Sequence, residues 1–82
     1  MNENEEIVFI KFFGNRLKEI RLKNNLSQEN LANDADIPIN QVGRIERAEI
    51  YTSLKTVFKL SKALKIDVVE FFIDNNEIIK KK

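Results

Sequence analysis

Apolar residues recur every three or four positions along most of this chain, the spacing that places them on one face of a helix. The first stripe, within residues 5–24, consists of Phe9, Phe13, Leu17 and Ile20. A later stripe, which we expect to form the inner face of a helix after Thr52 or Ser53, consists of Leu54, Val57, Phe58, Leu60, Ala63 and Leu64. The whole pattern predicts five helices and no strand.

Polar residues mark where the predicted helices begin and end. Ser27 precedes the second apolar stripe and is expected to cap that helix, with Glu29 in the first turn, where a negative charge is favoured. Asn24-Asn25 and Asp36 lie where the first two helices should end, and both residue types tolerate a positive φ.

Three further positions bear on the helix boundaries. Gly14 interrupts the first helix at a cost of about 1 kcal/mol relative to Ala, so we expect the segment before it to be a separate turn or a bent start. Pro38 suits the first turn of the third helix, because its missing N–H would be unpaired there. Asp67 followed by Glu70 predicts a capping-box-like start for the fifth helix.

Residues 26–47 predict two short helices around a tight turn. Apolar residues are spaced to form the inner faces of the pair, and the small Ala32 lies where the two axes must approach most closely. This arrangement is typical of a helix-turn-helix, the motif that places a helix in the major groove of DNA. The inner faces are expected to consist of Leu31, Ala35, Ile37, Val42 and Ile45.

Length and composition narrow the function classes. We expect residues 1–82 to form one domain, with the motif at about 27–47, an extension at 1–11 and a tail at 74–82. Cysteine and histidine are both absent from the sequence, which excludes disulfides, Cys/His zinc sites, thiol nucleophiles and imidazole bases. Hydrolysis by paired carboxylates stays formally open, but the two glycines form no phosphate-binding loop. We therefore expect a protein that is not an enzyme and needs no metal or cofactor.

Neither a membrane segment nor a signal peptide is expected. The longest apolar stretches, at 7–13 and 68–73, are far shorter than the roughly 20 residues that cross a bilayer. The acidic start at 2–6 is opposite in charge to a signal peptide. We expect a cytoplasmic, nucleoid-associated protein.

The net charge of +1 says little by itself, but the basic residues are unevenly distributed. They leave a basic middle between acidic residues near the N-terminus and at 67–77. This middle either faces phosphates or is an ordinary solvated helix surface. Its members are Lys11, Arg16, Lys18, Arg21, Lys23, Arg44, Arg47, Lys55, Lys59 and Lys62.

Several short motifs follow one another along about residues 12–72. They are Phe13-Gly14-Asn15-Arg16-Leu17-Lys18-Glu19-Ile20-Arg21, Leu26-Ser27-Gln28-Glu29-x-Leu31-Ala32, Ile37, Val42-x-Arg44-Ile45-Glu46-Arg47, Ser53-Leu54 and Ala63-Leu64-Lys65-Ile66. Together they resemble the phage-repressor/Cro-type helix-turn-helix family, also called XRE. The resemblance implies a compact, five-helix, lambda-repressor-like domain that binds operator DNA, generally as a dimer. Asp36, Pro38 and Gly43 depart from the family pattern, in which glycine occupies the turn and a small hydroxyl residue caps the recognition helix.

The third helix is expected to read bases. With Val42 and Ile45 turned inward, a step of about 100° per residue leaves the intervening polar residues on the open face. Amide side chains suit adenine, arginine suits guanine, and an aliphatic side chain can pack on a thymine methyl. Gly43 should share this face, either by simple tolerance or because it closely approaches DNA or a neighbouring helix. The predicted base contacts are Ile39, Asn40, Gln41 and Arg44.

Phosphates should meet the start of the second helix, whose free N–H groups and positive dipole end attract them. The resemblance implies that the loop after the third helix also lies near the phosphates. The predicted backbone contacts are Ser27, Gln28, Gly43, Arg47, Tyr51, Thr52 and Lys55. The resemblance further implies a structural ion pair between Arg21 and Glu46. Apolar residues beyond the needs of the core predict a dimer interface at Val69, Phe72, Ile73, Ile78 and Ile79.

The sequence therefore predicts a regulator that binds specific double-stranded DNA, as a repressor or controller protein acting as a homodimer on a palindromic operator. A regulatory protein partner is also possible. The alternative is an interaction adaptor of the same fold, such as a toxin-binding antitoxin, with no primary role on DNA.

Overall fold

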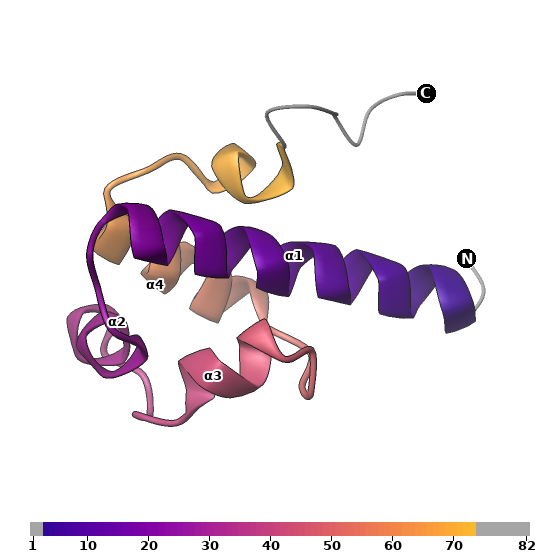
Figure 1. The fold of residues 1–82 in the computed structure, drawn as a ribbon, viewed down its shortest axis with the longest axis horizontal. Coiled ribbons are helices and arrows are strands. Elements are labelled where there is room, and N and C mark those ends of the chain that lie inside the picture. Colours follow the sequence, from indigo (N-terminus) through magenta and orange to yellow (C-terminus); the bar gives the residue numbers. More distant parts are fainter. Residues whose placement is uncertain (1–2, 74–82) are drawn as a thin grey trace.

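In the computed structural model, which describes residues 3–73, the regular elements are helical. They are α1 (Glu3–Lys23), α2 (Gln28–Ala35), α3 (Gln41–Glu46) and α4 (Leu54–Leu64), followed by the 3₁₀ helix η1 (Val68–Phe72). Figure 1 shows α1 along the length of the molecule, with α2 and α3 below it and α4 behind. The all-α class is confirmed. None of the described helices is both long and apolar enough to span a bilayer.

The predicted fifth helix is the five-residue 3₁₀ helix η1, so the described residues contain four α-helices and the predicted count of five helices was slightly off. The Asp67 side chain forms no capping hydrogen bond with the described backbone, and only its carbonyl is used, by Glu70 N–H at 3.0 Å. The Glu70 carbonyl accepts instead from Arg16 Nε at 2.8 Å. Arg16 thus ties this turn to α1, and no α-helical register develops among the five residues.

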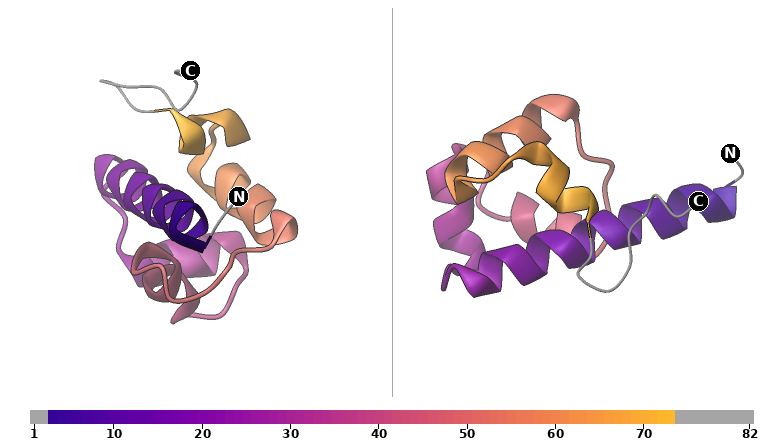
Figure 2. Two further views of the ribbon diagram at one scale, coloured as in Figure 1. Left: turned by 90° about the vertical axis from the view of Figure 1, so that its right-hand side faces the viewer. Right: turned by 90° about the horizontal axis from the view of Figure 1, so that it is seen from above.

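Helix α1 continues through Gly14 without a break, contrary to the predicted separate turn or bent start. Its N-terminal end projects beyond the other helices, as Figures 1 and 2 show from different sides. Gly14 is buried, and a Cβ there would lie only 2.6 Å from the carbonyl oxygen of Ile45 and 2.9 Å from that of Glu46. The glycine therefore allows α1 and α3 to touch through their backbones.

Several predicted helix ends are confirmed. The Ser27 hydroxyl accepts from Asn30 N–H at 2.9 Å and caps α2. Asn25 and Asp36 adopt left-handed backbones with φ of 58° and 59°. Pro38 was placed wrongly, because α3 begins at Gln41 and the proline opens the preceding turn, where its carbonyl accepts from Gln41 N–H at 3.0 Å.

The predicted inner face of α4 was partly wrong. Ser53 caps this helix through a hydrogen bond from Thr56 N–H, but Leu54 is 87% exposed and Phe58 57% exposed. Phe9 of α1 is likewise 44% exposed. The 3.6-residue period allowed a wide stripe, of which only part meets the rest of the protein. The buried core consists of Phe13, Leu17, Ile20, Leu31, Ala32, Ala35, Val42, Ile45, Val57, Leu60, Leu64 and Phe71.

Candidate nucleic-acid interface

Helix α3 is held by its apolar side and presents its polar side outward. Val42 and Ile45 are 0% and 1% exposed and belong to the core. Arg44, between them, is exposed, with 49% of its side chain accessible. The backbone contact at Gly14 brings α3 against the middle of α1, which sets how far the polar side stands out from the protein.

The residues predicted to read bases surround the start of this helix. Ile39 is 54% exposed, Asn40 is exposed and Gln41 is half-buried. Asn40 occupies the N-cap position, yet within the described residues its side-chain amide has no hydrogen-bond partner. With Arg44, these residues present two amides, one guanidinium and one aliphatic side chain, a set that can recognise base edges in a major groove.

Gly43 does not lie on the open face, so that prediction was wrong. It is buried, and a Cβ there would lie 3.0 Å from both Gln28 Oε1 and Arg47 Nη1. The Gln28 side chain reaches across from α2 and covers this part of α3. Of the two reasons considered for the glycine, close approach to a neighbouring helix is the one that the geometry favours.

Beneath α3, a buried ion pair links it to α1. Arg21 Nε and Nη2 donate to the two carboxylate oxygens of Glu46 at 2.7 and 3.0 Å, and Arg21 Nη1 donates to the Leu26 carbonyl at 2.9 Å. The two side chains are only 7% and 3% exposed. Gln28 Nε2 also donates to Glu46, at 3.0 Å. The network joins α1, α2 and α3, and the half-buried Gln28 at the start of α2 takes part in it.

Other residues predicted to contact the DNA backbone are accessible. Ser27 is exposed at the start of α2, although its hydroxyl already caps that helix. In and after the loop that follows α3, Tyr51 is 76% exposed, Thr52 is half-buried and Lys55 is exposed. The predicted contacts thus lie, in this order along the chain, at the N-terminus of α2, on the outer side of α3 and in the loop that follows α3.

The predicted basic middle is not one surface. Arg21 is buried in the ion pair with Glu46, and Arg16 is 7% exposed, with its guanidinium held by Glu19 and by Glu70. Neither guanidinium faces solvent, because Arg21 joins α1 to α3 and Arg16 joins α1 to η1. For Arg16 and Arg21, the prediction that the basic middle faces phosphates and the alternative that it is an ordinary solvated helix surface were both wrong.

Sequence reasoning missed one acidic residue at this face. Glu49, in the loop after α3, accepts from Arg47 Nε at 2.7 Å, and its carboxylate lies 3.8 Å from Arg44 Nε. The hydrogen bond from Arg47 lowers the pKa of Glu49, and the same pairing raises the pKa of Arg47. The carboxylate is therefore charged at neutral pH. The spacing of Arg44, Arg47 and Glu49 around the end of the predicted helix was the signal that could have revealed it.

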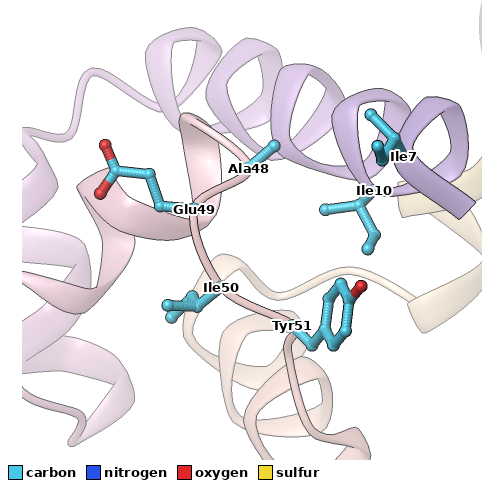
Figure 3. Close-up of a pocket in the computed structure, with 6 residues that line it drawn as sticks. All are labelled: Ile7, Ile10, Ala48, Glu49, Ile50 and Tyr51. Carbon is cyan, nitrogen blue, oxygen red and sulfur yellow. The ribbon is translucent and has the colours of Figure 1, made fainter. Parts of the chain in front are cut away.

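Two hollows border the loop after α3. One, of about 270 Å³, lies between the loop and the N-terminal part of α1 and is lined by Ile7, Ile10, Ala48, Glu49, Ile50 and Tyr51 (Figure 3). The other, an apolar groove also of about 270 Å³, is lined by Phe9, Ile10, Phe13, Tyr51, Thr52, Leu54, Val57 and Phe72. No group of three His, Cys, Asp or Glu side chains able to hold a metal ion occurs in the described part of the chain.

Comparisons with known proteins agree with this geometry. The model of the Helix-turn-helix family HTH_3 matches residues 17–71. Control protein C.BamHI from Bacillus amyloliquefaciens is 40% identical over 63 residues, which cover 72% of this chain and 78% of that protein.

Two solved structures share the fold. The restriction-modification controller protein C.AhdI from Aeromonas hydrophila superposes with a TM-score of 0.78 at 38% identity, covering 79% of this chain and 98% of that one. An HTH_3 family transcriptional regulator from Vibrio cholerae superposes with a TM-score of 0.80 at 26% identity, over 84% of this chain and 39% of that chain. These relatives are regulatory proteins and not enzymes.

Proposed function

Because this chain belongs to the Helix-turn-helix family HTH_3 and is a DNA-binding transcriptional regulator, we propose that it places α3 in the major groove of a specific operator. The observation that carries this proposal is the outward display of Asn40 and Arg44 on a helix whose other side is locked into the core. A helix held so firmly can present base-reading groups without having to fold on the DNA.

Within this proposal, Asn40 and Gln41 bind adenine, Arg44 binds guanine and Ile39 packs on a thymine methyl. Each good bidentate contact contributes about 1–3 kcal/mol of base discrimination. Phosphate contacts position the protein without reading sequence. We assign these contacts to Ser27, Gln28, Arg47, Tyr51, Thr52 and Lys55, and no longer to the buried Gly43.

We further propose that the protein acts as a controller of the kind named for its relatives, working at the nucleoid in the cytoplasm as a repressor or activator. C.AhdI is described as a restriction-modification controller protein and C.BamHI as a control protein. One domain covers too few base pairs for selectivity in a genome. A homodimer on two half-sites about one helical turn apart solves that difficulty.

The apolar groove supports a homodimer. Leu54 and Phe58 lie four residues apart on one face of α4 and are largely exposed, and Val69 of η1 is 53% exposed. Phe72 stacks on Phe9 across the groove, with ring centroids 5.8 Å apart. We propose that this surface meets its copy in a second subunit. Of the predicted interface, Phe72 lines the groove, the exposed Val69 lies on η1 outside the lining, and Ile73 directly follows Phe72. Ile78 and Ile79 lie outside the described residues.

Selection of bound sequences from a random duplex library tests the function. We expect an enriched, palindromic site whose affinity falls steeply as salt rises, because neutralised phosphates release counterions. Arg44→Ala should relax the preference at one position in each half-site, whereas Lys18→Ala, on the exposed side of α1, should not.

An interaction adaptor of the same fold would behave differently. The exposed apolar groove is the observation that favours this second function, because a partner other than a second copy could occupy it. An adaptor would enrich no sequence and would show no salt-dependent affinity for duplex DNA. Such a result would overturn the proposed regulator.

A further inference from the structure

One carboxylate lies against both exposed arginines at the C-terminal end of α3. Glu49 Oε2 accepts from Arg47 Nε at 2.7 Å, and Oε1 accepts from Arg47 Nη2 at 3.4 Å. Glu49 Oε1 also lies 3.8 Å from Arg44 Nε. The three side chains are 47–57% exposed, so DNA that approaches the arginines also approaches the carboxylate.

Backbone hydrogen bonds fix the position of Glu49 at the end of α3. Glu49 N–H donates to the Arg44 carbonyl at 2.9 Å, and Ala48 N–H donates to the Ile45 carbonyl at 3.0 Å. Together with the left-handed Ala48, these bonds form a Schellman motif that folds the loop back over the end of α3. Glu49 is one of the residues that line the hollow between the loop and α1, but Figure 3 shows its carboxylate directed away from Ile7 and Ile10.

The two arginines are engaged in different ways. Arg47 uses both Nε and Nη2 on Glu49, so a phosphate must displace the carboxylate before it can accept both bonds from that edge. Arg44 approaches Glu49 most closely through Nε, at 3.8 Å, which is beyond hydrogen-bond distance, so its two terminal nitrogens stay able to donate together to O6 and N7 of a guanine. A negative charge at this point therefore opposes phosphate binding more than it opposes base recognition.

We propose that Glu49 is a specificity-determining positioning residue, which weakens the phosphate contact that every duplex offers while keeping the Arg44 fork aimed at guanine. The inference rests on the proposed function, in particular on the contact between Arg44 and a base. Glu49 would then raise the ratio of operator affinity to non-operator affinity without touching a base itself.

The test compares Glu49→Gln with the wild type on two duplexes, the sequence selected from a random library and a shuffled version of it, across a range of salt. Glu19→Gln is the matched control, because it removes the same charge from α1, where Glu19 is paired with Arg16. We expect Glu49→Gln to bind the shuffled duplex more tightly, with a salt slope steeper by about 0.9 for each additional phosphate that the protein neutralises. In Glu49→Gln, the ratio of the affinity for the selected duplex to that for the shuffled duplex should fall about threefold or more, because the recognition of one base is weakened.

Arg44→Ala in the same titration separates failure of the inference from failure of the proposed function. A lower ratio in both Glu49→Gln and Arg44→Ala supports the inference. A lower ratio in Arg44→Ala alone overturns the role of Glu49 and leaves the base contact standing. An unchanged ratio in Arg44→Ala shows that the proposed base contact itself is wrong, and the inference falls with it.

Discussion

At the scale of single residues, the pair formed by Arg21 and Glu46 shows what a buried charge needs. Both side chains are almost fully buried. The arginine also donates to the Leu26 carbonyl, and the carboxylate also accepts from the Gln28 amide. Among the described residues, every buried side-chain nitrogen or oxygen has a hydrogen-bond partner. Satisfying each group in this way offsets the desolvation that burial imposes.

Arg21→Ala should therefore destabilise the protein by about 3–5 kcal/mol, because it leaves the Glu46 carboxylate buried without its counter-ion, with the neutral Gln28 amide still donating to it. Urea unfolding measures the effect. Lys23→Ala, at an exposed position of the same helix, should change little. An apolar pair, Arg21→Met with Glu46→Leu, should lose less than Arg21→Ala. Unchanged stability together with lost operator discrimination would contradict the structural role.

Ala48 holds a backbone conformation that suits glycine better. Its φ is 59°, and its N–H closes the turn after α3. A left-handed backbone costs an alanine about 1–2 kcal/mol, and glycine avoids this cost. Part of the stability gained is lost again, because glycine also raises the conformational entropy of the unfolded chain.

We expect Ala48→Gly to stabilise the protein by about 1 kcal/mol in thermal or urea unfolding. Ala63→Gly, inside α4, is the matched control and should destabilise by about 1 kcal/mol. If both substitutions destabilise to a similar extent, the strain at Ala48 is not relieved by removing its Cβ.

At the scale of elements, the meeting of α1 and α3 depends on Gly14. The carbonyl oxygens of Ile45 and Glu46 occupy the space that a Cβ would need. Because both obstacles are backbone atoms, rotation of a side chain cannot relieve the clash. The two helices would have to move apart, and the Arg21–Glu46 pair spans the same joint.

Gly14→Ala is thus expected to destabilise by about 1–3 kcal/mol, despite the higher helix propensity of alanine. Asn15→Ala, one residue further along and exposed, should be neutral or slightly stabilising. Comparison of their unfolding midpoints decides the point. Should Gly14→Ala prove as stable as Asn15→Ala, the close backbone contact would not matter to the fold.

At the scale of the whole molecule, the apolar side chains left outside the core matter most. Leu54 lines the groove between α1, α4 and η1, and the exposed Phe58 lies four residues further along α4. The groove and the outer side of α3 use different residues, so one could pair subunits while the other meets bases. Tyr51 and Thr52, which we assign to phosphates, also line the groove.

Leu54→Asp should abolish the proposed dimer without lowering the stability of the monomer, because Leu54 is 87% exposed and adds little to the core. Light scattering at micromolar concentration measures the change. Leu22→Asp, at a 54% exposed position of α1 outside the groove, should leave the dimer intact. A wild-type protein that stays monomeric, even with operator DNA added, would rule out this interface.

Local features were predictable because their causes are local. Ser27 caps α2 because its hydroxyl reaches an N–H three residues away, and Asp36 turns the chain because its side chain tolerates a left-handed backbone. Leu54 and Phe58 were assigned to the core wrongly, since periodicity identifies an apolar face but not the element that covers it. Gly43 was misplaced for a related reason, because Gln28 arrives from another helix.

The sequence by itself determined the helical class, most helix ends and the motif that carries Asn40 and Arg44, since these depend on spacing and on capping chemistry within a few residues. Only the tertiary structure decided that Arg16 and Arg21 join helices, that Gly14 admits α3 against α1, and that Glu49 faces two arginines. Each of these depends on the distance and orientation between elements, which are set by how the whole core packs.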